Sequence, residues 1–109
     1  MKVLQFILSA LILVGAIYVW GKVRVYVAKN HMNKGLAHLE KGNPLEAIRE
    51  FQEATTDLGN KPEIWHYLAL AFYHAGALDE ARQALMKALQ TKPDYEPSLK
   101  LQKKIDKTT

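Results

Sequence analysis

Two different patterns of hydrophobic and polar residues divide the chain near residue 27. Residues 3–20 are almost continuously apolar, with only Gln5 and Ser9 as polar interruptions. Further along, apolar residues recur at the spacing that places them on one face of a helix. The pattern predicts an all-α protein with an apolar N-terminal helix and further helices over residues 29–41, 44–57, 63–75, 78–91 and 96–107.

The second part of the chain contains a pattern that returns after 34 residues. Small and apolar residues carry it, since Gly42, Ala47, Phe51 and Ala54 have counterparts at Gly76, Ala81, Leu85 and Ala88. A fixed period of this length indicates helix-turn-helix repeats that stack on one another. Stacked repeats present binding surfaces rather than catalytic clefts, so the pattern favours an interaction function.

Local signals mark the helix boundaries in this region. Gly42 and Gly76 fall in the tight turns predicted within each unit, where glycine adopts a positive φ at little cost. Asn43 is placed to cap the helix that begins at Pro44, with Glu46 three residues after the cap.

Together these residues resemble the signature of the tetratricopeptide repeat. The second unit, residues 62–95, matches the family's spacing at Trp65, Leu68, Ala69, Phe72, Gly76, Ala81, Leu85, Ala88 and Pro93. The first unit, residues 28–61, matches at Gly35, Gly42, Ala47, Phe51 and Ala54, and departs at His31, Lys34, His38 and Gly59. The resemblance implies two repeats within a domain over residues 28–109, closed by a capping helix over residues 96–107.

In this family the first helix of each unit lines a concave groove that binds partner proteins. The resemblance implies a partner-binding groove formed here by Met32, Asn33, Leu36, His66, Tyr67, Leu70, Tyr73 and His74. Such an apolar and aromatic surface suits an apolar helix or an extended peptide. Apart from Asn33, it lacks the lysine, asparagine and arginine set with which some members hold a C-terminal carboxylate. The alternative is that these residues cover the chain's own N-terminal linker.

The apolar segment has the length of a membrane span. As a helix, its eighteen residues, 3–20, extend about 27 Å, close to the hydrocarbon thickness of a bilayer. Tyr18 and Trp20 end the run, as aromatic side chains often do at the membrane interface, and cationic residues follow. We therefore expect residues 1–27 to form an uncleaved single-pass anchor with a basic juxtamembrane segment.

A secretory signal peptide is the alternative interpretation of the same segment. Val14-Gly15-Ala16 supplies small residues at the spacing of a cleavage site, which would place cleavage near Ala16. The apolar character continues beyond this point through residues 17–20, which a signal peptide does not require. The retained anchor is therefore favoured.

One face of the anchor is smaller and more polar than the rest. Gln5, Ser9, Ile12 and Ala16 follow at i, i+4, i+7 and i+11, and they form a stripe suited to contact with other transmembrane helices. Alternatively, Gln5 lies near the interface and Ser9 hydrogen-bonds to its own backbone.

The formal net charge of +4 comes from residues beside the apolar segment. Residues 1–30 contain Lys2, Lys22, Arg24 and Lys29 and no acid, whereas the eleven basic and eleven acidic side chains of residues 31–109 cancel. This distribution indicates a membrane anchor with flanking cations and argues against nucleic-acid binding by the repeats. It also favours a cytoplasmic repeat domain, as in a single-pass protein of the bacterial inner membrane.

No motif in the chain points to catalysis, a cofactor or a metal. With no cysteine, disulfides and thiolate chemistry are excluded, and the phosphate-loop, G-x-S-x-G and H-E-x-x-H motifs are absent from the sequence. His31 and His38 are separated by about 10 Å along a helix, too far to share one ion without a third element. Glu50, Glu53 and Asp57 form an acidic stripe typical of solvated surface. We expect a non-enzyme with no cofactor.

These observations favour a membrane-anchored interaction module that recruits or braces a protein partner in a membrane complex. Within the same class, the chain could be a permanent accessory subunit held mainly through its transmembrane helix. An exported soluble assembly factor is the third interpretation, and it requires cleavage near Ala16.

Overall fold

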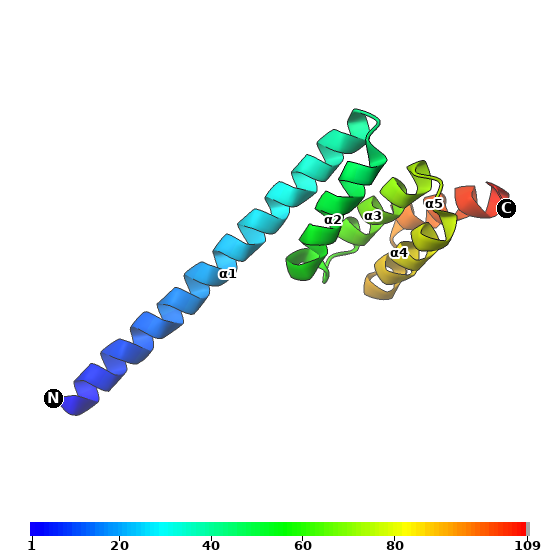
Figure 1. Ribbon diagram of the computed structural model, residues 1–109. Coiled ribbons are helices and arrows are strands. Elements are labelled where there is room, and N and C mark those ends of the chain that lie inside the picture. Colours follow the sequence, from blue (N-terminus) through cyan, green and yellow to red (C-terminus); the bar gives the residue numbers. More distant parts are fainter. Residues whose placement is uncertain (109) are drawn as a thin grey trace.

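A computed structural model describes residues 1–108, and these form five α-helices and no strand. The helices are α1 (Lys2–Glu40), α2 (Pro44–Leu58), α3 (Pro62–His74), α4 (Leu78–Thr91) and α5 (Glu96–Thr108). Figure 1 shows a long α1 whose N-terminal part extends away from a small bundle, which the rest of α1 forms with the other four helices. The predicted all-α architecture is confirmed. Thr109, the last residue of the predicted repeat domain, lies outside the described residues.

Helix α1 combines two segments that were predicted to be separate helices. We predicted an apolar helix followed by a new helix from residue 29, whereas α1 continues without a break over 39 residues. Residues 21–28 contain no proline, and the single Gly21 costs only about 1 kcal/mol relative to alanine. That penalty is too small to end a helix that has several turns on either side. The division at residue 27, between the anchor with its basic juxtamembrane segment and the repeat domain, therefore stays a prediction.

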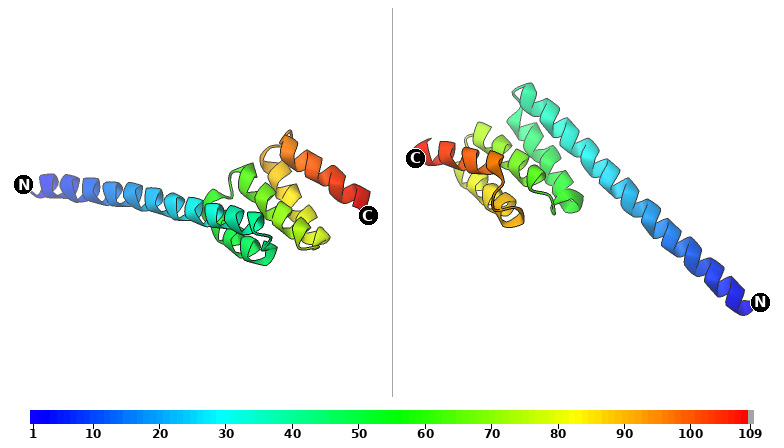
Figure 2. Two further views of the ribbon diagram at one scale, coloured as in Figure 1. Left: turned by 90° about the horizontal axis from the view of Figure 1, so that it is seen from above. Right: turned by 180° about the vertical axis from the view of Figure 1, so that it is seen from behind.

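The bundle consists of two helix pairs and a fifth helix. The second half of α1 packs along α2, α3 packs along α4, and α2 joins the two pairs through α3 (Figures 1 and 2). Helix α5 covers the end of the stack, where it contacts α4 and α3. The alanines that carry the repeat pattern are all fully buried, namely Ala47, Ala54, Ala81 and Ala88. Phe51, Ile64, Leu85 and Ile105 are the largest apolar side chains that are fully buried.

Both predicted turns have the expected backbone conformation. Gly42 and Gly76 have φ values of 78° and 81°, in the left-handed region that favours glycine. Asn43 precedes Pro44 at the start of α2 as predicted, but the Asn43 side chain makes no capping hydrogen bond. The predicted capping interaction is therefore wrong, and the backbone N–H of Asn43 instead donates to the carbonyl of His38 at 2.8 Å.

We predict that Gly76→Val destabilises the repeat domain by about 2 kcal/mol, because a β-branched residue is strained at a positive φ. The open space around Gly76 means that backbone strain, rather than a clash, is the cause. Urea unfolding of the full chain in detergent measures the loss. Ala75→Val is the matched control, since Ala75 is exposed in the same turn with a φ of −81°. Equal losses of stability for the two substitutions would contradict the conclusion that the turn requires glycine at position 76.

Candidate functional site

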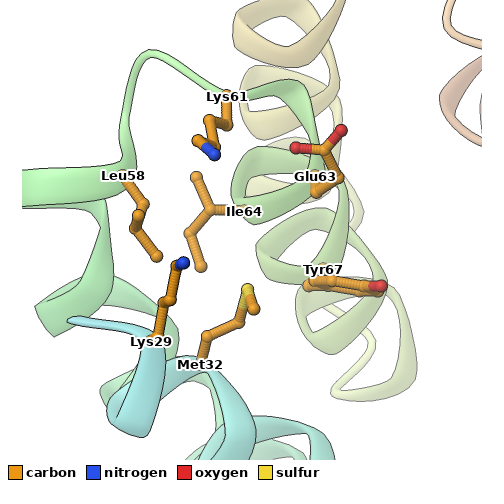
Figure 3. Close-up of a pocket in the computed structure, with 7 residues that line it drawn as sticks. All are labelled: Lys29, Met32, Leu58, Lys61, Glu63, Ile64 and Tyr67. Atoms are coloured by element: carbon orange, nitrogen blue, oxygen red, sulfur yellow. The ribbon is translucent and has the colours of Figure 1, made fainter. Parts of the chain in front are cut away.

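A pocket of about 180 Å³ lies at the seam between the two helix pairs (Figure 3). Lys29 and Met32 come from α1, Leu58 ends α2, Lys61 lies in the following loop, and Glu63, Ile64 and Tyr67 begin α3. The walls are apolar, because Leu58 and Ile64 are buried core residues and Met32 and Tyr67 pack against the same core. The pocket thus combines a hydrophobic interior with charged side chains at its opening.

Two lysines and one glutamate supply the charge around the pocket. Figure 3 shows the Lys29 and Lys61 ammonium groups at opposite ends of the Ile64 side chain. Both lysines are exposed, and neither side chain forms an ion pair within residues 1–108. Glu63 lines the same pocket, but it forms no ion pair with either lysine within residues 1–108. The lining therefore carries two positive charges and one negative charge.

The predicted groove residues fall into four places, the last of which is the surface beside the capping helix. Met32 and Tyr67 meet in the pocket, and the Tyr67 ring stacks on Phe51 with the centroids 5.9 Å apart. Leu36 and Tyr73 pack against the core. Asn33 and His74 are exposed, and His74 lies beside the turn that joins α1 to α2. The assignment of the groove as a binding surface stays a prediction, but several of its members also stabilise the fold.

His66 and Leu70 face the capping helix. His66 Nδ1 lies 3.1 Å from Oγ of the fully buried Ser98, and the His66 ring meets the Tyr95 ring edge-on at 5.9 Å. Burial lowers the pKa of His66, which favours the neutral ring at neutral pH. Both residues line a second hollow with α5, whose lysines Lys100 and Lys104 border it. The family pattern alone did not indicate this contact, because it says nothing of how a capping helix docks.

Two polar contacts between α1 and α2 were not predicted. Arg24 forms an ion pair with Asp57 at 2.8 Å, and His31 Nδ1 lies 2.6 Å from a Glu50 carboxylate oxygen. The interpretation of the acidic stripe as solvated surface is therefore wrong for Glu50 and Asp57, which face α1, whereas Glu53 is exposed. These contacts could have been anticipated from the basic side chains Arg24 and His31, because antiparallel packing of the two helices brings them beside the acids of α2.

Lys29 and Lys61 were not among the predicted site residues. Lys29 was interpreted as one of the cations that flank the anchor. Lys61 directly precedes Pro62, the first residue of the second unit, and was given no role. Lys29 lies one helical turn before Met32, so its position on the same face was readable from the helical period. The position of Lys61 depends on the loop between α2 and α3, which no periodicity specifies.

Apart from the ion pair between Arg24 and Asp57, the N-terminal part of α1 stands away from the bundle (Figure 1). Every residue from Met1 to Val27 is exposed, including the predicted contact stripe of Gln5, Ser9, Ile12 and Ala16. By length and composition, α1 is apolar enough to cross a membrane. Within residues 1–108, no three histidine, aspartate or glutamate side chains come together as metal ligands would.

The similarity to known proteins covers the helical bundle and not the apolar segment of α1. No curated protein is similar enough in sequence to match this chain. A family model, described as the tetratricopeptide repeat, matches residues 32–96, which is more than half of the 109 residues. Proteins of this family are typically non-catalytic modules that bind other proteins. From the buried repeat positions, the two glycine turns and this match, we conclude that the chain belongs to the tetratricopeptide repeat family.

Proposed function

We propose that this protein is a membrane-anchored interaction module that recruits or braces a protein partner at the bilayer surface. The partner would be an apolar helix or peptide, and the process would be the assembly or support of a membrane protein complex. The continuity of α1 carries this proposal, because the same helix supplies the apolar segment and the first helix of the repeat domain. Tethering raises the effective concentration of the domain near membrane partners, so that a small binding surface suffices.

An exported soluble form is disfavoured by what cleavage would leave behind. Cleavage after Ala16 would keep residues 17–20 as a free helical end. These residues are Ile17, Tyr18, Val19 and Trp20, and each of them is exposed by 59% or more of its surface. A contiguous apolar end of this kind promotes aggregation in water, whereas an apolar surface is normal for a helix inside a membrane.

We predict that alkaline carbonate extraction leaves the full-length protein in the membrane pellet. The physical reason is that residues 3–20 would have to move from hydrocarbon into water, and this almost continuously apolar segment opposes that transfer. Release of full-length protein into the supernatant would refute the anchor. A mature form that begins at Ile17 would instead support the exported form.

A second experiment separates recruitment through the repeats from permanent attachment through the anchor. We predict that a photo-crosslinking amino acid at the exposed Asn33 forms adducts with a partner, whereas the same group at Ile12 forms few. The exposed Met86 on α4, which is outside the predicted groove, is the matched control on the repeat domain. If the probe at Ile12 instead formed adducts with one partner at a constant ratio, and the probe at Asn33 formed none, the protein would be an accessory subunit held by its transmembrane helix.

The cations that follow the apolar segment favour a cytoplasmic position for the repeat domain. Lys22 extends over the Tyr18 ring, 5.4 Å from its centroid, as expected for a side chain that lies along the helix at an interface.

A further inference from the structure

The continuous helix fixes how far each part of the repeat domain lies from the membrane. Lys29, at the pocket, lies nine positions after Trp20, which ends the apolar run, and this is about 13 Å along the axis. The headgroup layer on each side of the hydrocarbon core is about 5–8 Å thick. If the proposed anchor holds, the pocket thus lies just beyond the headgroups, at the height of a neighbouring membrane protein's juxtamembrane segment.

The pocket has the size and charge to receive one particular kind of side chain. A cavity of about 150 Å³ holds a benzene ring, so the pocket of about 180 Å³ accommodates one branched or aromatic apolar side chain. Lys29 and Lys61 flank the opening and form no ion pair within residues 1–108, so the lining stays net positive even with the Glu63 carboxylate. An apolar residue with carboxylates beside it would bury its side chain against Met32 and Ile64 and pair with both ammonium groups.

We propose that this pocket binds a short acidic segment with a central apolar residue, located directly outside the membrane span of a partner membrane protein. The inference rests on the proposed anchoring function and specifies the partner class for it. From the hydrocarbon edge, the segment reaches the pocket after about four extended residues at 3.3–3.6 Å each. Because both proteins are confined to one bilayer, weak contacts of this size become effective.

The test places the full chain in nanodiscs of neutral phosphatidylcholine with a synthetic peptide as the probe. The peptide carries two acyl chains, a Gly-Ser spacer of about four residues to span the height, and a photo-reactive leucine between acidic residues. We expect irradiation to produce adducts that mass spectrometry maps to Met32, Ile64 or Tyr67. A peptide without the spacer is expected to give few adducts, because its leucine stays within the headgroup layer.

Charge reversal then tests the role of the two lysines. Lys29→Glu plus Lys61→Glu is expected to lower adduct formation about tenfold, because two attractions become repulsions. Lys103→Glu plus Lys107→Glu makes the same charge change at exposed positions of α5, and this control is expected to leave adduct formation unchanged. A peptide with lysines in place of the acids is expected to restore adducts on the Lys29→Glu plus Lys61→Glu variant, which also verifies that this variant folds.

Three results would overturn the proposal. The first is equal adduct formation by acidic and basic peptides on the unaltered protein. The second is loss of adducts when phosphatidylglycerol replaces part of the neutral lipid, together with labelling of the pocket by a photo-reactive phosphatidylglycerol, which would assign the pocket to lipid. The third is protein that enters the discs but gives no adducts, which refutes the pocket inference alone. Protein that elutes free of the discs would refute the anchor as well.

Discussion

Phe51→Ala is expected to destabilise the repeat domain by about 3–5 kcal/mol, the range for removing a buried phenylalanine from a core. The Phe51 side chain is completely buried on α2, where its ring stacks on Tyr67 from the next helix pair. Its loss leaves a cavity that helices on both sides cannot fill without moving. A domain of about 80 residues is stable by only about 4–12 kcal/mol, so much of its folded population should disappear.

Urea unfolding of the full chain in detergent, followed by the fluorescence of Trp65, measures this effect. Trp65 donates a hydrogen bond to the Gly59 carbonyl at 2.8 Å and is contacted by Lys87, so it reports on the packing of α3 against its neighbours. Trp20 is replaced with phenylalanine in all samples, which leaves one tryptophan. Leu45→Ala is the matched control on α2, because Leu45 is 69% exposed. Similar losses for the two substitutions would contradict the core assignment.

Gly35 explains why the first helix can approach Phe51 so closely. A Cβ on Gly35 would lie 2.5 Å from Cε1 of the Phe51 ring, which is closer than real Cβ contacts allow. Gly35→Ala alone should therefore be destabilising, whereas in the Phe51→Ala background the added methyl meets a cavity. The two substitutions are expected to be non-additive, with Gly35→Ala nearly neutral or stabilising in the double variant.

Much of the repeat bundle was predictable because its residues carry local constraints. The positive φ of Gly42 and Gly76 and the burial of the repeated alanines follow from backbone sterics and from the spacing of small residues. Helix α4 begins and ends where it was predicted, and α2, α3 and α5 end within one residue of their predicted ends. The exposed lysines of α5, with Leu101 and Ile105 buried, also follow the helical period.

Features that join separate elements were not predictable in the same way. The pairing of Arg24 with Asp57 depends on how two helices align, and the contact of His66 with Ser98 depends on how α5 docks. The pocket likewise requires the α2–α3 loop to bring Lys61 to Ile64 and Lys29. Periodicity places residues on the faces of one helix, but it does not specify which neighbour those faces meet.

Val23→Pro tests whether the anchor and the repeats are coupled through one helix. Proline at this position removes the hydrogen bond from residue 23 to the Val19 carbonyl and clashes with it, at a local cost of about 3 kcal/mol. Val23 lies between the end of the apolar run and Ala28, the first buried residue of α1. We therefore expect the repeats to stay folded and the anchor to stay in the membrane, while the helix kinks between them.

The measurement uses spin labels on cysteines introduced at Ile12 and Glu53, which are both exposed, in a chain that has no cysteine of its own. In nanodiscs, the unaltered backbone should give a narrow distribution of distances between the labels, because one helix connects the anchor to α2. Val23→Pro should shift or broaden that distribution, and Val23→Ala should leave it narrow, since alanine favours the helix. A broad distribution without any substitution would mean that the bilayer does not set the height and orientation of the pocket. The partner would then have to be recognised by chemistry alone, without the positional selection that a continuous α1 provides.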